Sequence, residues 1–403
     1  MNILFVHEVD WLNKVVFDIH SLAEAMSLRG HKISAVDYEN TWQRNHFFDL
    51  GSFKTRLFKG VSRALPGASV NLHRPGFIKM PGLSRLSVAI TTYYEICRIV
   101  RQEKIDAIVL YSVPTSGLQA VSIARKFQIP VIFRSIDILN QLVPSRALRP
   151  FTRFLERKVY ANADKILTLT PGLSEYVIRL GADRRKVNLL LMPVDTGIFH
   201  PMPEPGYLRE KWGLAPHDRV VLFMGTLFDF SGLDTFIPGF AKVTEKVPEA
   251  KLLILGDGPQ RARLDALISE LKLKDRVIIT GFQPYDTMPQ YINLAAVCIN
   301  TFNVTDATRD IFPGKTVQFL ACGKPLVATA LPGMSAVIPG EKQGIVYVTT
   351  PEEMVKEIIS LLEYGERSQR LGEAGLAYIR QSHSYESIAR QLEEQIVEAI
   401  MQK

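Results

Sequence analysis

The sequence predicts an α/β fold made of two doubly wound, Rossmann-like domains, and three observations support this prediction. Short apolar segments of strand length alternate with amphipathic helical segments through almost all of the 403 residues, as in parallel sheets covered by helices on both faces. Prolines and glycines cluster near residues 193–218, which indicates a linker between domains. The alternation then restarts, and the length is sufficient for two ordinary domains.

The first domain is expected over residues 1–196. Its opening, MNILFVHEVD, has neither the basic n-region nor the small-residue cleavage site of a signal peptide, so it is predicted to be the first strand. The predicted strands are Asn2–Val6, Lys32–Val36, Ala107–Tyr111, Val131–Arg134, Lys165–Thr170 and Val187–Leu191. The predicted helices lie near Val16–Arg29, Ser87–Gln102, Gly117–Lys126, Phe151–Ala161 and Pro171–Leu180.

The second domain is expected over residues 219–383, after a linker at 197–218. Its predicted strands are Val220–Met224, Lys251–Leu255, Arg276–Thr280, Val297–Asn300, Pro325–Thr329 and Ile345–Val348. A final helix at about 384–403 is expected to pack back on the first domain. Two such sheets joined by one linker are expected to form a cleft between the carboxyl ends of both sets of strands, where ligands of these sheets bind.

The segment Leu50–Leu65 interrupts the first domain and is predicted to be a basic amphipathic helix. Apolar side chains fall on one side of its helical wheel, and Arg56, Lys59 and Arg63 fall on the other. Between Arg44 and Arg85 there are eight basic residues and one acidic residue, Asp49. Such a helix can lie on an anionic membrane surface. The alternative is a helix that covers the sheet and leaves its polar face in water.

Composition excludes several classes of protein. No run approaches the roughly 18 apolar residues of a membrane helix. The three cysteines, Cys97, Cys298 and Cys322, lie far apart, which fits a reducing cytosol and excludes a disulfide framework. The net charge is +7, but the sequence has no helix-turn-helix, zinc-finger or RNP pattern, so no nucleic-acid partner is expected. No metal site is expected, because zinc spacings and paired aspartates separated by one residue are absent.

The segment RDIFPGKTVQFLACGKPLVATALPG, from Arg309 to Gly333, contains an unusual cation. Pro313 and Gly314 are predicted to open a helix. Lys315 then lies in its first turn, at the positive end of the helix dipole, where a cation is disfavoured unless an anion faces it. Gln318 shares its face. The segment therefore indicates a phosphate site, with a solvated lysine and an incidental glutamine as the alternative.

Two glycine turns follow predicted strands of the second domain. Gly225 and Thr226 follow the strand VVLFM, and the loop runs on to Ser231, which forms a capping-box pattern with Asp234. Gly256-Asp257-Gly258-Pro259 follows KLLIL and lacks the third glycine of a dinucleotide fingerprint. Together with Lys315, these turns describe a diphosphate or nucleotide pocket. Ser231 has an alternative role as a plain N-cap.

Polar residues also follow strands of the first domain. They are His7, Glu8, Asp10 and Trp11 after the first strand, Ser112 to Ser116 after Tyr111, and Arg134, Ser135 and Asp137 around the end of VIFR. Asp137 is expected to face the cleft, where it would act as a base or orient a hydroxyl. Capping of the next turn is the alternative for this aspartate.

Several segments resemble the retaining GT-B glycosyltransferases of group 1, the GT4-like branch. They are LAEAMSLRGHKISAV, VYANADKILTLTPGLSEYV, LLLMPVDTGIFHP, GDGP, TGFQPYDTMPQYINLAAV and FPGKTVQFLACGKPLVAT. The resemblance extends over nearly the whole chain. The resemblance implies a nucleotide-sugar donor in the C-terminal domain and an acceptor in the N-terminal domain. It also implies that Lys315 faces the donor diphosphate, Gln318 the ribose, and the backbone near Phe282 the base.

The sequence departs from this family at several site positions. Thr226 and Ser231 stand where the family usually has arginine and lysine. The paired glutamates, eight residues apart, are replaced by Asp310 and Gln318, and Arg309 precedes the first of them. Trp11, Leu12, Asn13 and Lys14 replace the paired glycines after the first strand. Asp137 is the polar residue nearest to the family's histidine position.

The function that the resemblance implies is metal-independent, retaining sugar transfer from a nucleoside-diphosphate sugar to an acceptor hydroxyl. The acceptor would be a polysaccharide, lipopolysaccharide or glycolipid precursor, and no cofactor is expected. The expected catalytic residues are Asp137, Lys315 and Asp310. The expected donor-binding residues are Gly225, Thr226, Ser231, Gly256, Gly258, Phe282, Arg309, Lys315 and Gln318, and the acceptor-binding residues are His7, Asp10, Trp11 and Lys14.

The expected location is the cytoplasm, with or without peripheral attachment to the membrane. Two alternatives of other classes share the fold. One is a binding or scaffold protein without catalysis, and the other is a sugar-nucleotide epimerase.

Overall fold

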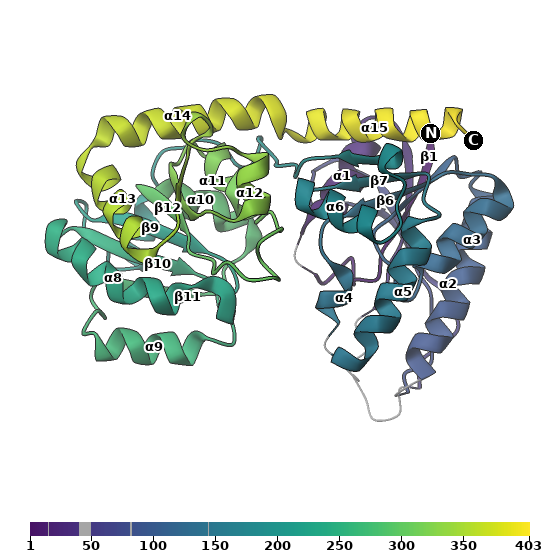
Figure 1. Cartoon of the computed structure of the whole chain (residues 1–403), viewed down its shortest axis with the longest axis horizontal. Helices are drawn as coiled ribbons and strands as arrows, with labels where there is room; N and C mark the ends of the chain where they lie inside the picture. Colours follow the sequence, from purple (N-terminus) through teal and green to yellow (C-terminus); the bar gives the residue numbers. More distant parts are fainter. Residues whose placement is uncertain (15, 40–49, 81–82, 144) are drawn as a thin grey trace. The chain divides into compact units, whose positions relative to one another are not determined.

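The computed structural model describes residues 1–14, 16–39, 50–80, 83–143 and 145–403. It divides into two compact units, Met1–Pro193 with Tyr385–Lys403, and Val194–Ser384. Each unit is built on a sheet of mainly parallel strands with helices on both faces (Figure 1). The predicted α/β class with two doubly wound domains is therefore confirmed.

In the described part of the first unit, eight strands form one sheet with the order β3-β4-β2-β1-β5-β6-β7-β8. The strands are β1 Asn2–Val6, β2 Lys32–Val36, β3 Arg56–Val61, β4 Val70–Arg74, β5 Ala107–Leu110, β6 Val131–Ser135, β7 Lys165–Thr168 and β8 Val187–Leu189. All neighbouring strands are parallel except β3 and β4. The chain continues to opposite sides from β1 and β5, which creates a topological switch point between them.

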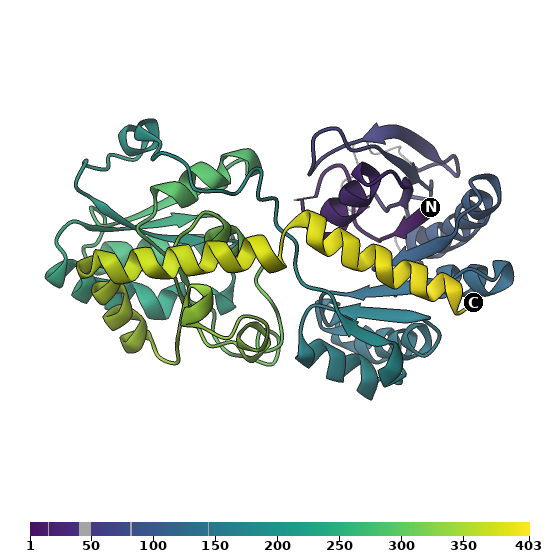
Figure 2. The same ribbon diagram turned by 90° about the horizontal axis from the view of Figure 1, so that it is seen from above.

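Helices cover both faces of this sheet. α1 (Asp18–Leu28) and α15 (Tyr385–Met401) contribute to the core on one face, and Figure 2 shows α15 lying across it. On the other face lie α2 (Leu83–Gln102), α3 (Gly117–Phe127), α5 (Arg149–Tyr160) and α6 (Pro171–Arg179). A short helix, α4 (Leu139–Leu142), precedes α5. Among the described residues, no helix combines the length and apolar composition needed to cross a bilayer.

The amphipathic helix predicted over Leu50–Leu65 is wrong, because this segment contains β3, which pairs antiparallel with β4 at the sheet edge. Gly60 has a φ of 63°, which suits a bulge more than a helix interior. The carboxylate of Glu24 accepts hydrogen bonds from the backbone N–H groups of residues 63–65 and holds them outside a helix. Pairing and capping by distant residues override the local pattern. Residues 40–49, where the basic stretch begins, lie outside the described residues.

The second unit is described throughout and contains a six-stranded parallel sheet with the order β11-β10-β9-β12-β13-β14. The strands are β9 Arg219–Met224, β10 Ala250–Leu255, β11 Val277–Gly281, β12 Val297–Asn300, β13 Leu326–Thr329 and β14 Ile345–Val348. α8 (Leu233–Lys246), α9 (Arg261–Glu270) and α13 (Pro351–Glu363) pack on one face. α10 (Met288–Leu294), α11 (Lys315–Ala321) and α14 (Gly365–Ser382) lie on the other (Figure 1).

Residues 197–218, expected as a linker, lie within the second unit and are ordered by contacts there. The segment contains a short helix, α7 (Gly206–Lys211), whose Leu208 is buried. Asn293 of α10 accepts a hydrogen bond from the backbone N–H of Met202 and donates one to the carbonyl of His200. The chain therefore changes unit at Pro193–Val194, before the proline-rich stretch.

Candidate functional site

Lys315 lies where the strand order of the second sheet reverses. It is the first residue of α11, and its Nζ is 4.1 Å from the ring centre of Phe223 in β9. The ring centre of Phe302, which follows β12, is 4.2 Å from the same Nζ. β9 and β12 are the two strands at the switch point, and ligands of doubly wound sheets bind outside the carboxyl ends of such strands. The structure thus brings the predicted phosphate-facing lysine to the expected ligand position.

The ammonium group of Lys315 is buried without an acceptor. Its Nζ has no hydrogen-bond partner among the described residues and no contact with solvent, although the residue as a whole is half-buried. Burial lowers the pKa of Lys315 from 10.5 to about 7. The two aromatic faces attract a cation, but they leave its N–H donors unused. An ammonium in this environment would be stabilised by an anion that reaches it.

The two glycine turns form one hydrogen-bonded edge beside Lys315. The N–H of Gly225 donates to the carbonyl of Leu255 at 2.9 Å, and the N–H of Leu227 donates to that of Asp257 at 3.0 Å. A Cβ on Gly225 would lie 3.4 Å from Lys315 Nζ, so the first turn borders the ammonium directly. Gly225 and Gly256 have φ values of 144° and 155°, which favour glycine at both positions.

We expect Gly256→Ala to separate the two turns. The added Cβ would lie 2.0 Å from the carbonyl oxygen of Gly225, so one turn must move. The expected result is a loss of stability of about 1–3 kcal/mol, as in other overpacked sites, together with weaker nucleotide binding. Thermal unfolding and calorimetry would measure both effects. Gly206→Ala is the matched control, because a Cβ there meets nothing within 4 Å. If the two variants have the same stability and the same nucleotide affinity, the close contact between the two turns is not needed for folding or binding.

Thr226 and Ser231, at the family's usual cationic positions, differ in placement. Thr226 is exposed in the first glycine turn. Ser231 is only 2% exposed, and its carbonyl accepts a hydrogen bond from Thr301 Oγ1 at 2.5 Å. The predicted N-cap and capping box at Ser231 are wrong, because the N-cap of α8 is Gly232, with a φ of 68°. A Cβ on Gly232 would lie 1.9 Å from the carbonyl oxygen of Thr301, the residue after β12. The close approach of these two backbone segments therefore requires glycine at the start of α8.

Gln318 and Phe282 lie at the edge of the same region. Gln318 Nε2 donates to the hydroxyl of Tyr285 at 3.4 Å, and burial raises the pKa of Tyr285 to about 12. Phe282 follows β11 and is 73% exposed. Gly281, just before it, pairs with Gly256 through an isolated bridge, so Phe282 adjoins the glycine turns. Gly258 contacts Leu227, where an added Cβ would lie 2.7 Å from the backbone nitrogen. Sequence analysis did not identify Tyr285 as part of this site.

Arg309 and Asp310 lie in the loop before α11. Arg309 is exposed, and its carbonyl accepts a hydrogen bond from the N–H of Gly333 at 2.7 Å. Asp310 is half-buried, and a Cβ on Gly333 would lie 2.5 Å from its backbone carbonyl carbon. The backbone of this pair is therefore held against the start of α12 (Pro332–Val337).

His7 marks the switch point of the first sheet. It follows β1, and its ring contacts those of Phe17 and Tyr111 at centroid distances of 5.4 and 5.8 Å. Its Nδ1 is buried without a hydrogen-bond partner in the described ranges. Burial, with smaller contributions from His20 and Lys14, lowers the pKa of His7 to about 3. A neutral imidazole at this position can donate or accept one hydrogen bond at physiological pH.

The other residues expected to bind the acceptor have different placements. Asp10 accepts a hydrogen bond from Arg74 at 2.7 Å and others from its own turn, which lower its pKa against the effect of burial. Trp11 is 1% exposed and belongs to the hydrophobic core. Both side chains are therefore engaged in structure. Lys14 is exposed, and its carbonyl accepts a hydrogen bond from Arg63 at 2.7 Å.

Asp137 lies just beyond the carboxyl end of β6 and is half-buried. Burial raises its pKa, and the charge of Asp18 raises it further. Asp18 belongs to a buried network that sequence analysis missed. It accepts hydrogen bonds from Tyr111 at 2.6 Å and from Arg134 at 2.8 Å. These residues are far apart in the sequence, so no local pattern could have identified the network. Its effect is to place a fixed charge near Asp137.

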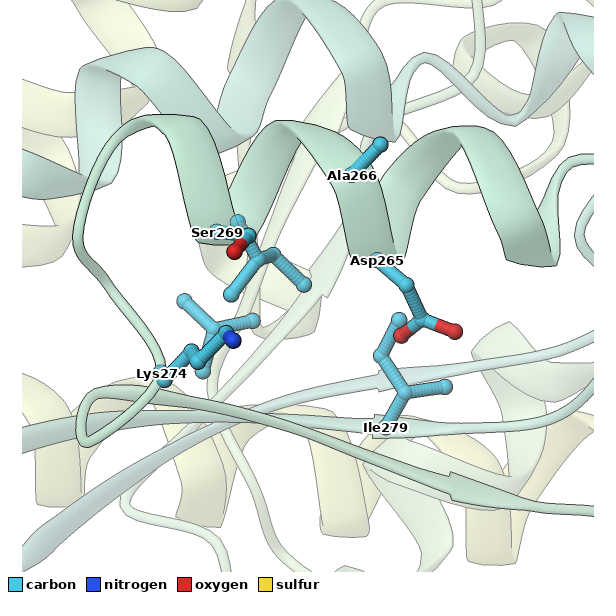
Figure 3. A pocket seen from close by; sticks show the side chains of 7 residues that line it. Asp265, Ala266, Ser269, Lys274 and Ile279 are labelled. Carbon is cyan, nitrogen blue, oxygen red and sulfur yellow. The ribbon is translucent and has the colours of Figure 1, made fainter.

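The described residues form no metal-binding cluster, and one pocket lies away from the predicted site residues. Among the described residues, no group of three or more His, Cys, Asp or Glu side chains is arranged to hold a metal. A pocket of about 490 Å³ lies between α9 and the edge strand β11, where Asp265, Ser269 and Lys274 line it (Figure 3). None of the residues predicted to bind the donor or acceptor, or to take part in catalysis, lines this pocket.

Two family models match separate parts of the chain. The model described as "Glycosyl transferase 4-like domain" matches residues 16–191, within the first unit. The model described as "Glycosyl transferases group 1" matches residues 207–377, within the second. The chain belongs to the group 1 glycosyltransferases. The resemblance seen in its motifs is thereby confirmed.

Curated relatives of this chain match over part of their length. A D-inositol 3-phosphate glycosyltransferase of Segniliparus rotundus is 25% identical over 55% of this chain and 50% of that protein. An alpha-D-kanosaminyltransferase of Streptomyces kanamyceticus is 30% identical over 57% of this chain and 58% of that protein. The chain thus spans about half the length of the curated relatives it matches.

Solved structures share the fold over the full length. Sucrose-phosphate synthase from Thermosynechococcus elongatus has a TM-score of 0.73 and 17% identity, with complete coverage of both chains. HepE of Anabaena, in complex with UDP-glucose, has a TM-score of 0.72 and 17% identity over 99% of this chain and all of that one. These similarities show that the chain has the GT-B fold.

Proposed function

We propose that the protein is a metal-independent, retaining glycosyltransferase that uses a nucleoside-diphosphate sugar and acts in glycolipid or polysaccharide synthesis. The ammonium of Lys315, buried at the switch point of the second sheet without a hydrogen-bond partner among the described residues, is the observation that carries this proposal. When the sugar–phosphate bond breaks, negative charge develops on the departing diphosphate. An ammonium fixed in a dry site stabilises such charge without reorganisation, which is a large term in catalysis. Lys315 would thus supply the charge that a metal supplies in other enzymes.

The proposed donor site extends outward from Lys315. The backbone of Gly225 and Thr226 borders the diphosphate, with Gly256 and Gly258 behind it. Gln318 faces the ribose, and the backbone at Phe282 faces the base. Arg309 and Asp310, in the loop before α11, complete the set, while buried Ser231 would act through its backbone. In support of this chemistry, a structural neighbour binds UDP-glucose, and relatives include GDP-mannose-dependent enzymes.

The acceptor is proposed to bind to the first unit. His7 and Asp137 each follow a strand at or beside its switch point. The acceptor hydroxyl would lose its proton as its oxygen bonds to the anomeric carbon, and Asp137, whose pKa is raised, is our candidate to orient or accept that proton. Lys14 remains available to an acceptor, whereas Asp10 and Trp11 would support the site through structure. A lipid-linked acceptor fits relatives that act on phosphatidylinositol mannosides.

Nucleotide binding and product formation test this proposal. Calorimetry with UDP, GDP and dTDP should show binding of at least one of them, and no binding at millimolar concentration would overturn it. Mass spectrometry of products from a panel of sugar nucleotides with membrane extract should then show one sugar added to an acceptor. Conversion of the sugar nucleotide without an acceptor would identify an epimerase instead.

A second candidate function is a binding protein of this fold without catalysis. Exposed Thr226 and buried Ser231 provide no charge where the family usually has two cations, and this observation favours it. Nucleotide binding without any transfer product would support this alternative against the enzyme.

Donor binding should depend on pH through Lys315. The pKa of Lys315 is about 7 in the free protein, so above pH 7 its amine is mostly neutral. A diphosphate favours the ammonium, so binding at pH 8 should take up close to one proton, and affinity should fall as pH rises. Calorimetry with a nucleotide sugar in two buffers of different ionisation enthalpy measures this uptake. Zero uptake, or the same uptake by Lys315→Met, would contradict the assignment.

A further inference from the structure

Helix α2 turns a row of apolar side chains away from the protein core. Leu83, Leu86, Ile90 and Tyr94 are 45%, 64%, 58% and 68% exposed. Their spacing of three or four residues places them on one side of the helix. The other side, with Ile96 and Ile99, packs into the core of the first unit. An amphipathic helix in water normally exposes polar residues on its outer side, so this row requires a partner surface.

The start of α5 carries a second row of the same kind. Leu148, Phe151 and Phe154 are 54%, 59% and 51% exposed and recur every three residues. Lys158 follows four residues after Phe154, and its Nζ lies 5.6 Å from the centre of that ring. Leu155 and Val159, on the side of α5 that faces the sheet, pack into the core. The exposed aromatic side chains of α5 are therefore bordered by cationic side chains.

The exposed charges beside both rows are positive. Between Ser145 and Lys158, all described, the basic residues are Arg146, Arg149, Arg153, Arg157 and Lys158. The only acidic residue of this stretch, Glu156, is fully buried and accepts hydrogen bonds from Asn140 and Tyr176. On α2 the only acidic residue, Glu95, is 5% exposed and bonded to His73. The charge of this surface is therefore complementary to an anionic partner.

The two rows belong to one face of the first unit. α3 packs against both α2 and α5 (Figure 1). Its Leu118 is 38% exposed. Arg85 in the first turn of α2 donates to Thr115 Oγ1 at 2.9 Å, just before α3 begins. The first turns of α2 and α3 thus lie near the carboxyl end of β5, the side of the sheet that carries His7.

We propose that the outer sides of α2 and α5 dock the first unit on an anionic lipid bilayer. Leucine and aromatic side chains would enter the headgroup region, and the arginines would meet lipid phosphates, as in helices that lie in a membrane interface. A second copy of this chain would present the same positive charge, so electrostatic repulsion disfavours self-association. The docking does not depend on the sugar-transfer chemistry proposed above, and it replaces the membrane contact expected at residues 50–65.

Vesicle sedimentation with the full chain tests the docking. We expect the protein to bind vesicles of phosphatidylcholine with phosphatidylglycerol, to bind pure phosphatidylcholine at least tenfold more weakly, and to be released by salt. Phe151→Ser with Phe154→Ser, and separately Arg146→Glu with Arg153→Glu and Arg157→Glu, should each lower the partition coefficient at least tenfold. All five side chains are exposed, so these variants should keep the fold, which circular dichroism would verify.

A matched control changes the same number of charges elsewhere. Lys242→Glu with Lys246→Glu and Lys272→Glu alters three exposed lysines of the second unit and should leave partitioning within about twofold of the parent. An equal loss in this control, or no binding of the parent to anionic vesicles, would overturn the proposal. Sedimentation equilibrium that shows a dimer lost in the phenylalanine variant would overturn it in favour of a second copy. Donor calorimetry of each variant separates a failed docking proposal from a failed donor assignment.

Discussion

Lys315→Met is expected to lower kcat/KM and donor affinity more than any other single change in the second unit. In the donor site proposed above, this side chain is the cation that meets the diphosphate, and Thr226 and Ser231 supply no replacement charge. Loss of one stabilising donor of this kind costs about 2.7–4 kcal/mol, a factor of about 10² to 10³ in rate. Calorimetry with nucleotide and initial rates of transfer would measure the loss. The loss should exceed the loss caused by the same substitution in relatives that also have the usual arginine and lysine at the positions of Thr226 and Ser231.

The same substitution should stabilise the free protein, which distinguishes a functional lysine from a structural one. Folding lowers the pKa of Lys315 from 10.5 to about 7, so the folded state binds fewer protons than the unfolded state between these values. The stability of the parent should therefore rise with pH across this window. Lys315→Met removes the buried charge, so its gain in stability should be greatest below pH 7 and shrink as pH increases.

Lys242→Met is the control for both measurements. Lys242 is an exposed lysine of α8 in the same unit, so its replacement should change neither donor affinity nor the pH dependence of unfolding. Lys315→Arg adds a second test, because arginine keeps the charge but not the shape of the amine. If Lys315→Met retains parental affinity and turnover, the donor site is not where we place it.

Asp18→Ala is expected to cause the largest loss of stability in the first unit. Arg134 is 1% exposed, and its guanidinium donates to Asp18 at 2.8 Å and to the carbonyl of Leu190 at 2.6 Å. Removal of the carboxylate leaves a buried charge without a counter-ion, which costs about 3–5 kcal/mol. Denaturant unfolding in a Trp212→Phe background measures this loss. In that background Trp11, which is buried in the core of the first unit, reports on its unfolding.

Two further variants separate the ion pair from its surroundings. Tyr111→Phe removes one hydrogen bond to Asp18 and keeps the pair, so it should cost only about 1 kcal/mol. Asp18→Ala combined with Arg134→Met removes both charges and should recover much of the stability lost in the single variant. If the double variant is as unstable as the sum of its parts, the loss does not come from an unpaired charge. Asp18→Ala should also lower the pKa of Asp137.

Local pattern predicted most of the strands and helices correctly. The strands Asn2–Val6, Lys32–Val36, Val297–Asn300 and Ile345–Val348 have the predicted bounds, and the other predicted strands differ by one or two residues at an end. These segments are buried runs of apolar residues, so their strand preference agrees with their place in the sheet. The prediction failed at Arg56–Val61 and Val70–Arg74, where β3 and β4 pair at an edge. Over Leu50–Leu65 the spacing of apolar residues also fits a helix, and the pairing with β4 and the carboxylate of Glu24 decide the structure. The sequence predicts no element over Val70–Arg74.

Among the site residues, Lys315 was identifiable because a cation at a helix start conflicts with the helix dipole. The roles of Trp11 and Asp10 were not identifiable, since a polar or aromatic residue after a strand can face either a ligand or the core. Burial of Trp11 and the bond from Arg74 to Asp10 decide these two cases. Arg74 is 64 positions away from Asp10 in the sequence, so local spacing could not reveal this bond.

The sequence by itself determined the two α/β domains, the family and the lysine that opens α11. These properties depend on local preferences and on motifs that are contiguous in the chain. Tertiary structure alone decided that Lys315 Nζ lies between Phe223 and Phe302 with no acceptor in the described part of the chain, and that apolar rows on α2 and α5 face outward. Charge, burial and exposure are properties of a side chain's complete surroundings, and folding assembles those surroundings from residues that are remote in the sequence.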